Sequence, residues 1–599
     1  MLICEQDHVL SGSLSWGEVV QHWTVTAATG RLIRYGLPAG LAIGLVSLVA
    51  FSECTGRDGQ GYWKFASVVF LYCITLTSLA VLLTRRFAFS LALTVAVGSA
   101  IFATSATKYD YLQTKLAAHD LYFHLADWAE IEFFLAHYSR LAVVAGVALC
   151  FVLAFLLTIW RLDATRVARP WAILMLCGCA ALSEYTARQI DETYLYASAA
   201  ALNGRYLSGF FLSTRIFVRT IGEPFRIPRS PTPVKAASMI PAIDLADNEG
   251  KRPHIIAILH ESSVDPSIYF RGDRYKVPQS FFTSGDGQRR RLSVHIWGGR
   301  TWVSEYGFLL GLDVSYFGER SGVLGVLAAG AFQNTLPQEL KRLGYTTIAN
   351  YPSPPSFMNT DRFYSSIGFD VLNEPKDMGL FIRPMEGGRP RDRQYYEFLM
   401  KDLDRRGTSK PLFYFVWTTA THGPYSNPEF PTERTEEVVP GDEAAEFARR
   451  QRFAAADLAW FEATLRTRFP NEKFLLVGFG DHHPYVAGAY FNAGLQDQGH
   501  EKSDSSEDMF KTYYRIVGVN FAPAYDQLPP AAEIGFLGEI VMQAARLPAG
   551  PSVLARRSLR VRCSGQWAKC NDQNAVLEAN TELSQGVSSL FTRREAESR

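Results

Sequence analysis

Charged residues are missing from four long stretches near the start of this 599-residue sequence. The stretches cover residues 35–51, 65–83, 87–106 and 141–160, and each approaches the roughly 20 apolar residues that a helix needs to cross a bilayer. Helices buried in soluble proteins rarely stay uncharged on every face for so long, so this absence argues against a wholly soluble chain. We therefore predict membrane-spanning helices, with a shorter run at 171–182 as a fifth.

We expect no cleavable signal peptide, because the first apolar run begins late and shows no obvious cleavage site. Basic residues before the first run and in the second and fourth connections are expected to face the cytoplasm. They are Arg31, Arg34, Arg85, Arg86, Arg161, Arg166 and Arg169. Five crossings then put everything after residue 182 outside the cytoplasm.

Cysteine is scarce, with 8 in the whole sequence. Four of these lie in the apolar runs, where we expect buried small hydrophobic residues: Cys73, Cys150, Cys177 and Cys179. Only Cys563 and Cys570 fall in the external tail. That close pair predicts a local disulfide in an oxidising compartment, or a free reduced pair if the topology is inverted.

Sequence pattern divides the chain into five parts. An N-terminal segment (1–34) precedes the transmembrane domain (35–187), and residues 188–227 combine aromatics, small residues and arginines at helical spacing. This pattern fits a helix on the membrane surface or a plain amphipathic linker helix. Proline-rich residues 224–234 mark a boundary within the linker region (188–250), because proline cannot continue a helix and stiffens a spacer. A folded domain (251–550) and an extension with a partly disordered polar tail (551–599) follow.

Short apolar strands alternate with helical segments in the folded domain. The expected strands are 254–260, 292–297, 346–351, 412–420, 473–481 and 514–520, and the expected helices include 336–343, 393–405 and 443–469. This alternation predicts an α/β fold with a mainly parallel, doubly wound sheet. In such sheets the ligand site lies beyond the carboxyl ends of the strands.

Polar residues stand at two of those strand ends. Glu261 directly follows the first strand, and Asp481 and His482 follow the fifth. Two carboxylates and an imidazole at equivalent ends are suited to one divalent cation. Taken singly, an acid at such a position is more often a helix cap and a histidine more often structural. Their coincidence makes a shared metal site the stronger interpretation.

We interpret Thr301 as a fourth ligand of this metal site and as the nucleophile. It stands in "WGGRTWVSEYGFLLGLD" (297–313), just before a helix expected over 302–310. Free N–H groups and the positive dipole end of that helix favour a phosphate or sulfate. A cation on the hydroxyl oxygen would lower its pKa, and Gly298 and Gly299 would let the backbone approach the substrate. Without the other ligands, Thr301 would be only a helix cap.

Four motifs carry a family resemblance. The string "GGRTWVSEYGFLLGL", with "HESS" (260–263) before it and "THGPY" (421–425) and "GDHH" (480–483) after it, resembles the sulfatase-type domain of lipoteichoic acid synthases and bacterial phosphoglycerol transferases. The likeness extends in motif order over about 251–545, and five membrane helices before an external domain match the family architecture. Within the family, the Gram-negative periplasmic glucan phosphoglycerol transferases are the most similar.

The resemblance implies roles for particular residues. Glu261, Thr301, Asp481 and His482 would bind one divalent metal, commonly manganese, with magnesium or zinc as alternatives, and Thr301 would be the nucleophile. His422 matches the family histidine that contacts the phosphate or the leaving group. Substrate contacts would also come from Gly299, Arg300 and, by a looser alignment, from Arg362 as the headgroup-binding arginine. Tyr306 and Leu310 depart from the family's usual Phe and Thr, which we interpret as packing changes.

Two related chemistries fit less well. A C-x-P-x-R or S-x-P-x-R segment, which a true sulfatase needs to make its aldehyde hydrate, is absent from the nucleophile region. A two-zinc phosphatase would need further ligands, for which His260, His483 and His500 are the candidates. Adjacent strand residues point to opposite faces, so His260 and Glu261 are not expected to share a metal. We interpret these histidines as supporting or structural.

The resemblance implies a two-step transfer at the plasma (inner) membrane, with the catalytic domain periplasmic or extracellular. Thr301 would take phosphoglycerol from phosphatidylglycerol, releasing diacylglycerol, and pass it to an acceptor hydroxyl. Arginine outnumbers lysine, which indicates a GC-rich genome. A GC-rich genome in turn favours a periplasmic glucan as the acceptor. The alternatives are a growing glycerol-phosphate chain, phosphoethanolamine transfer to glucan or lipid A, and a catalytically silent membrane scaffold. No nucleic-acid partner is expected.

Overall fold

The computed structural model describes two compact units of the chain. One is a helical unit within Met1–Ala106, Tyr138–Asp191 and Asn203–Leu212, and the other is an α/β unit made mostly of Ser213–Arg599. The described residues are 36–54, 62–112, 138–190, 205–222, isolated positions between 115 and 135, and 251–570 with gaps at 271, 315–316, 318–320, 323, 328, 356, 381–388, 431–440, 488–507 and 568–569. The predictions for 1–34, 223–250, His500 and the polar tail therefore lie outside the described residues.

Helices form at all five predicted apolar runs. They are α2 (Leu37–Cys54), α3 (Tyr62–Thr84), α4 (Phe87–Leu112), α7 (Ser139–Leu162) and α8 (Arg169–Arg188). Among the described helices, α3, α4 and α7 are long and apolar enough to cross a membrane, whereas α2 is a shorter apolar helix and α8 ends with charged residues. The second, third and fourth predicted spans thus have structural support, and the first and fifth stay a prediction.

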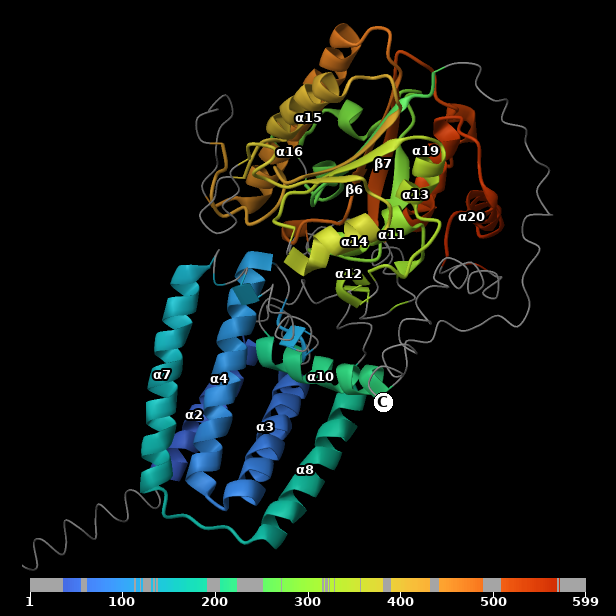
Figure 1. The fold of residues 1–599 in the computed structure, drawn as a ribbon. Helices are drawn as coiled ribbons and strands as arrows, with labels where there is room; N and C mark the ends of the chain where they lie inside the picture. Colours follow the sequence, from blue (N-terminus) through green and yellow to red (C-terminus); the bar gives the residue numbers. More distant parts are fainter. Residues whose placement is uncertain are drawn as a thin grey trace, which may run out of the picture. The chain divides into compact units, whose positions relative to one another are not determined.

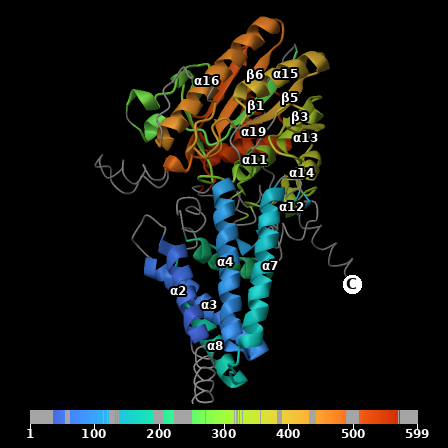
Figure 2. The ribbon, with the colours of Figure 1, turned by 90° about the vertical axis from the view of Figure 1, so that its left-hand side faces the viewer.

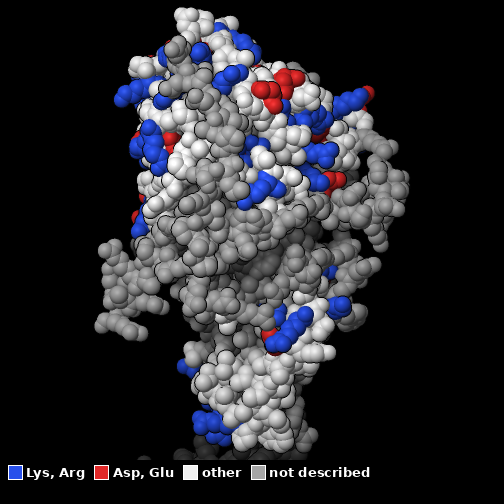
Figure 3. Space-filling model, turned by 90° about the vertical axis from the view of Figure 1, so that its right-hand side faces the viewer, with Lys and Arg blue, Asp and Glu red and all other residues white. Residues whose placement is uncertain are grey.

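The exposed side chains of the helical unit are mostly apolar. Phe151 and Val143 on α7 are 72% and 66% exposed. Figure 3 shows the other side of the helical unit, which carries α8, and there too few charged side chains interrupt the white surface of the described residues. Cys150 on α7 and Cys177 on α8 are exposed as well, so the expectation that both are buried was wrong. Among the residues that the structure describes, no helix covers these two side chains, whereas Cys179 is half-buried and Cys73 on α3 is buried. Such apolar outer faces suit contact with lipid.

Within the predicted 188–227 segment the structure contains α10 (Tyr206–Gly222), while residues 191–204 and 223–227 lie outside the described part. In Figure 1 α10 lies crosswise to α3 and α8. Its first turn is held by the end of α2: Glu53, buried, accepts hydrogen bonds from the Ser208 hydroxyl (2.7 Å) and the Ser208 N–H (3.1 Å). A carboxylate at this position satisfies the free N–H groups of the helix start.

The α/β unit is built on one eight-stranded sheet with the strand order β4-β3-β5-β1-β6-β7-β2-β8. Neighbours from β4 to β6 are parallel, β7 is antiparallel to both β6 and β2, and β8 is parallel to β2. The strands are β1 (His254–His260), β2 (Arg290–Ser293), β3 (Thr346–Asn350), β4 (Val371–Asn373), β5 (Leu412–Thr418), β6 (Phe474–Gly480), β7 (Lys511–Val519) and β8 (Ala531–Glu533). The predicted α/β fold with a mostly parallel sheet is confirmed.

Helices cover both faces of the sheet, as Figures 1 and 2 show. Alternate residues of β1 explain why: Ile255, Ala257 and Leu259 enter one core, and Ile256 and Ile258 enter the other. The first core packs under α11 (Thr301–Leu310), α13 (Leu336–Arg342), α14 (Thr360–Ser366), α19 (Ile534–Ala544) and α20 (Pro551–Arg562). The second packs under α15 (Asp392–Arg406) and α16 (Glu443–Arg468). The short helix α12 (Leu324–Leu327) lies between α11 and α13 in sequence.

Strand β2 is shorter than predicted. We expected it over 292–297, but it ends at Ser293 because the next residues turn towards the loop after β6. There the Gly298 N–H donates to the His483 carbonyl (3.0 Å), and Gly298 has a left-handed φ of 72°. This turn is what delivers the chain to the start of α11.

Candidate active site

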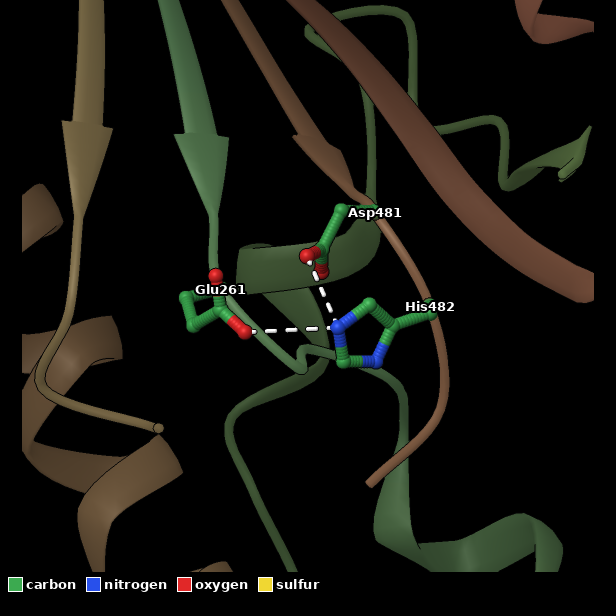
Figure 4. Close-up of side chains that lie close together, drawn as sticks. All are labelled: Glu261, Asp481 and His482. Carbon is green, nitrogen blue, oxygen red and sulfur yellow. Dashed lines mark ion pairs between the residues drawn. The ribbon is translucent and has the colours of Figure 1, made fainter. Parts of the chain in front are cut away.

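Glu261, Asp481 and His482 meet beyond the ends of two neighbouring central strands. His260 at the end of β1 is paired with Gly480 at the end of β6, so the residues that follow emerge at the same level. All three side chains are almost fully buried, and one ligand atom from each lies within 4.8 Å of the others. Figure 4 shows them converging, with one imidazole nitrogen of His482 facing both carboxylates.

Thr301 joins this cluster as the first residue of α11. Its hydroxyl donates a hydrogen bond of 2.7 Å to Glu261 Oε2 and lies 3.2 Å from His482 Nε2. The Ser304 hydroxyl, one turn along the helix, donates to the Asp481 carbonyl (2.6 Å) and ties α11 to the end of β6. All four residues that we predicted as metal ligands from the sequence therefore lie together in the structure.

The electrostatics of the cluster centre on His482 Nε2, which lies 3.3 Å from Glu261 Oε1 and 3.2 Å from Asp481 Oδ2. Burial alone would lower the pKa of His482, but the two carboxylates raise it to about 9. Burial and the nearby charge of Glu261 raise the pKa of Asp481 to about 7. The pKa of Glu261 is held at about 2, because His422 and His482 outweigh its burial. Two adjacent carboxylates thus require a positive charge between them.

The residues present fit a divalent cation. His482 Nδ1 faces the His483 carbonyl at 2.9 Å, an arrangement that leaves Nε2 as the metal-binding nitrogen. Asp481 Oδ2 is buried and has no hydrogen-bond partner among the described residues. Two carboxylates, one hydroxyl and one imidazole form an oxygen-rich donor set, which suits Mn²⁺ or Mg²⁺, and the imidazole also suits Zn²⁺.

Two supporting contacts were missed by sequence reasoning. The indole N–H of Trp417, on β5, donates to Glu261 Oε2 (2.9 Å), and the backbone N–H of Ser262 donates to Asp481 Oδ1 (2.7 Å). The period-two alternation of β5 was a usable signal for Trp417, because it places that residue on the same face as Phe413 and Phe415.

Gly480 allows the two ligand-bearing strand ends to lie close together. A Cβ atom at this position would stand 2.0 Å from the Ser263 carbonyl oxygen, a distance that no side chain tolerates. The Thr512 hydroxyl on β7 donates to the Gly480 carbonyl (2.7 Å) and fixes it from the other side. The spacing of Glu261 and Asp481 therefore depends on a residue without a side chain.

His422 lies in the loop after β5, beside the cluster. The neighbouring Thr421 hydroxyl donates to the backbone carbonyl of Glu261. His422 Nδ1 faces the Gly423 carbonyl, so its Nε2 is the nitrogen left for a ligand. Burial and the charge of Arg389 lower the pKa of His422 to about 4. A neutral imidazole at this position can accept or share a proton with a bound group.

The remaining predicted substrate contacts are more dispersed. Arg362 lies on the exposed face of α14, and in the part of the chain that the structure describes no hydrogen bond joins its side chain to the cluster. Arg300 packs its guanidinium against Gly322, where a Cβ would stand 2.0 Å from Nη2. Gly299 is partly exposed next to Thr301. Their substrate contacts stay predictions, and Arg389 is a buried cation near His422 that the sequence did not reveal.

His260 and His483 point away from the cluster. His260 faces Asp392 (3.6 Å) and packs on Phe281, on the other side of β1 from Glu261. His483 Nε2 faces the Lys511 carbonyl (2.8 Å), and its Nδ1 faces the Tyr269 hydroxyl. Neither belongs to the group of potential metal ligands found in the described residues, which is Glu261, Asp481 and His482.

A disulfide joins Cys563 and Cys570 immediately after α20. Both sulfur atoms are buried against the core that contains α19 and Trp567. The loop that they close contains few residues, so the bond holds the end of α20 locally.

Comparison with known sequences gives a family match and one relative. Residues 253–512 match the sulfatase family model. An uncharacterized protein from Haemophilus influenzae is 26% identical over 319 residues, which are 50% of this chain and 54% of that protein. The chain therefore matches about half the length of this relative.

Solved structures similar to this chain include one synthase and two transferases. The lipoteichoic acid synthase LtaP from Listeria monocytogenes is 16% identical, with a TM-score of 0.38 over 50% of this chain and 73% of that one. The phosphoglycerol transferase GacH from Streptococcus pyogenes is 17% identical, with a TM-score of 0.42 over 58% and 91%. The phosphoethanolamine transferase EptA from Neisseria meningitidis is 12% identical, with a TM-score of 0.42 over 85% and 97%. The match to the sulfatase family model runs from β1 to the first residues of β7 and includes all four residues of the cluster, Glu261, Thr301, Asp481 and His482.

Proposed function

We propose that this protein is a membrane-anchored, metal-dependent transferase that moves a phosphoglycerol group from phosphatidylglycerol, through Thr301, to an extracytoplasmic glycan such as a periplasmic glucan. One observation carries the proposal. The Thr301 hydroxyl stands at the start of a buried helix, 2.7 Å from Glu261 Oε2 and 3.2 Å from His482 Nε2. A hydroxyl among these ligands has the setting of an activated nucleophile.

In the first step Thr301 Oγ1 attacks the phosphorus, diacylglycerol leaves, and a phosphoglycerol ester remains on Thr301. Glu261, Asp481 and His482 would hold the cation with Thr301, and that cation would supply charge stabilisation for the threonine oxygen and the phosphoryl oxygens. The positive dipole end of α11, at Thr301, would favour the same phosphoryl oxygens. His422 Nε2 contacts the phosphate or the leaving oxygen, and the Thr301 proton passes to the departing diacylglycerol. An acceptor hydroxyl then attacks the ester, the bond between phosphorus and Thr301 Oγ1 breaks, and the acceptor proton restores the Thr301 hydroxyl.

Phosphoryl transfer fits this site better than sulfate hydrolysis. Thr301 occupies the nucleophile position without the C-x-P-x-R or S-x-P-x-R segment that aldehyde formation requires. The string around Thr301 also resembles phosphoglycerol transferases, as described above. Both features favour a threonine ester intermediate within a sulfatase-family domain.

A lipid donor fits the rest of the chain. Helices α3, α4 and α7 are long and apolar enough to confine the protein to a membrane, where phosphatidylglycerol is confined too, which raises its effective concentration. The Cys563–Cys570 disulfide supports an oxidising compartment outside the cytoplasm for the α/β unit. These features support a plasma (inner) membrane location with the α/β unit outside the cytoplasm.

The test is a mass measurement. Full-length protein in detergent is incubated with Mn²⁺ and either phosphatidylglycerol or phosphatidylethanolamine, without acceptor. The protein is then digested, and the mass of the peptide containing Thr301 is measured by mass spectrometry. A phosphoglycerol adduct on Thr301 is expected from the first lipid and none from the second. A phosphoethanolamine adduct from the second lipid would identify phosphatidylethanolamine as the donor instead. Absence of both an adduct and diacylglycerol, with or without added glucan, would overturn the proposal.

A further inference from the structure

Beneath the loop that carries His422 lies a buried network of charged side chains from α16. Glu446, Arg449 and Arg450 project from adjacent positions of this helix, and their side chains are 6%, 2% and 0% exposed. Glu446 bonds both arginines and also accepts a hydrogen bond from the Glu429 N–H (2.9 Å). Charges buried this deeply are tolerated only when they are paired and fully hydrogen-bonded.

Arg450 is the member of this network that hydrogen-bonds the backbone of the His422 loop. Its Nη1 donates to the His422 carbonyl (2.7 Å), and its Nη2 donates to the carbonyls of Pro424 (3.0 Å) and Asn427 (2.9 Å). Its Nε donates to Glu446 Oε1 (2.7 Å), and the guanidinium lies 5.1 Å from the ring centre of Tyr425.

Only arginine has a fork of donors in fixed directions that can bond three carbonyls and one carboxylate at once. A lysine in its place keeps the charge but presents a single ammonium group at the end of a flexible stem. The loop would therefore lose the bond to one or more carbonyls, including the carbonyl of His422 itself, while Glu446 kept a cationic partner.

We propose that Arg450 is a positioning residue for the transfer reaction, because it fixes the backbone of His422 and thereby aims the imidazole at the phosphoryl group. This inference rests on the proposed function, which gives His422 its contact with substrate. Arg450 touches no reacting atom in this account, and its effect on turnover passes entirely through His422.

Arg449 provides a matched control. It comes from the same helix, is equally buried and shares the same carboxylate, with its Nε 2.7 Å from Glu446 Oε2. Its backbone contact is the carbonyl of Glu429 and not that of His422. Arg449→Lys therefore disturbs the same charge network without releasing the histidine.

The experiment is a double-mutant cycle on the full-length protein, with turnover of whichever of phosphatidylglycerol or phosphatidylethanolamine the wild type cleaves. We expect Arg450→Lys to lower kcat by roughly 10²-fold with KM for the lipid unchanged, because misplacing a catalytic group by about 1 Å costs this much. Arg449→Lys should turn over close to the wild-type rate per folded molecule. In a His422→Ala background, Arg450→Lys should cause no further loss.

Additive losses from Arg450→Lys and His422→Ala, or equal losses from the two arginine variants, would overturn the inference while leaving the proposed function intact. A wild type that cleaves neither lipid would overturn the proposed function and the inference with it. If Arg450→Lys does not fold, Tyr425→Phe takes its place in the cycle. It removes one hydrogen bond from the same loop, Tyr425 Oη to the Thr421 carbonyl (2.8 Å), and opens no cavity. Non-additivity of Tyr425→Phe with His422→Ala supports the step that the inference requires, the positioning of His422 through this loop, and additivity overturns it.

Discussion

The indole N–H of Trp417 donates a hydrogen bond of 2.9 Å to Glu261 Oε2, the same oxygen that accepts the Thr301 hydroxyl. Glu261 Oε1 is then left to face His482. The carboxylate is therefore oriented by β5 and α11 before any ligand arrives, which lowers the cost of ordering the site on binding.

Trp417→Phe should weaken metal binding, because it removes one of the three side-chain donors to Glu261, the others being the hydroxyls of Thr301 and Ser262, while keeping an aromatic ring in the core. We expect a loss of about 10- to 100-fold in affinity for Mn²⁺, the usual effect of removing such a supporting contact. Titration calorimetry on the metal-free protein measures it. Trp460→Phe on α16, a tryptophan that packs under Arg393, is the control. Equal affinity in Trp417→Phe and the wild type would contradict the assigned role.

Thr301→Ala should abolish transfer without unfolding the protein. The substitution removes one hydroxyl and its hydrogen bond to Glu261, at a cost of about 1 kcal/mol in the free energy of unfolding. Thr301→Ser retains a nucleophile and should keep part of the turnover. Diacylglycerol release and the melting temperature are measured together. Transfer that persisted in Thr301→Ala would refute the covalent role of this residue.

Metal removal should lower both activity and stability. A ligand that binds only the folded state stabilises it by about 2.7 kcal/mol at a concentration one hundred times its Kd. We therefore expect chelation to lower the melting temperature and Mn²⁺ to restore it. In Asp481→Asn, which lacks one carboxylate of the cluster, the response to Mn²⁺ should be much smaller. Activity surviving exhaustive chelation would count against a metal-dependent reaction.

Glu305 should make stability depend on pH. Burial raises the pKa of this carboxyl to about 8, against an ordinary value of 4.5, so the folded state holds a proton that the unfolded state releases. The contribution is fully present below pH 4.5 and is lost as pH rises towards about 8, at roughly 1.4 kcal/mol per pH unit within that window. Melting temperatures across this range should fall more steeply for the wild type than for Glu305→Gln. Parallel curves would show that Glu305 titrates normally.

Much of the α/β fold was predictable because its central strands are long, apolar and buried on both faces. β1, β5 and β6 have seven residues each and are buried throughout, and their bounds nearly match the prediction. β4 and β8 were not predicted, because three residues each are too few to show an alternation of apolar and polar residues. The antiparallel direction of β7 was also hidden, because strand direction depends on pairing that the sequence pattern does not reveal.

The candidate site was predictable where it depended on strand ends and less so where it depended on loops. Glu261, Asp481 and His482 directly follow strands, so the topology alone brings them together. Arg450 and Trp417 act through contacts that arise only once the loop after β5 has folded back on α16 or once strand neighbours are known. Arg362 was proposed from a loose alignment, and its exposed position on α14 gives that proposal no geometric support.

Gly480 limits how this site can be altered. Since a Cβ there would collide with the Ser263 carbonyl, the strand ends that carry Glu261 and Asp481 have one available separation. An engineer who wished to change the preferred ion would have to exchange the ligating side chains, because the backbone offers no room for adjustment. Natural variation meets the same limit: the ligating side chains can change while the separation of the strand ends stays fixed.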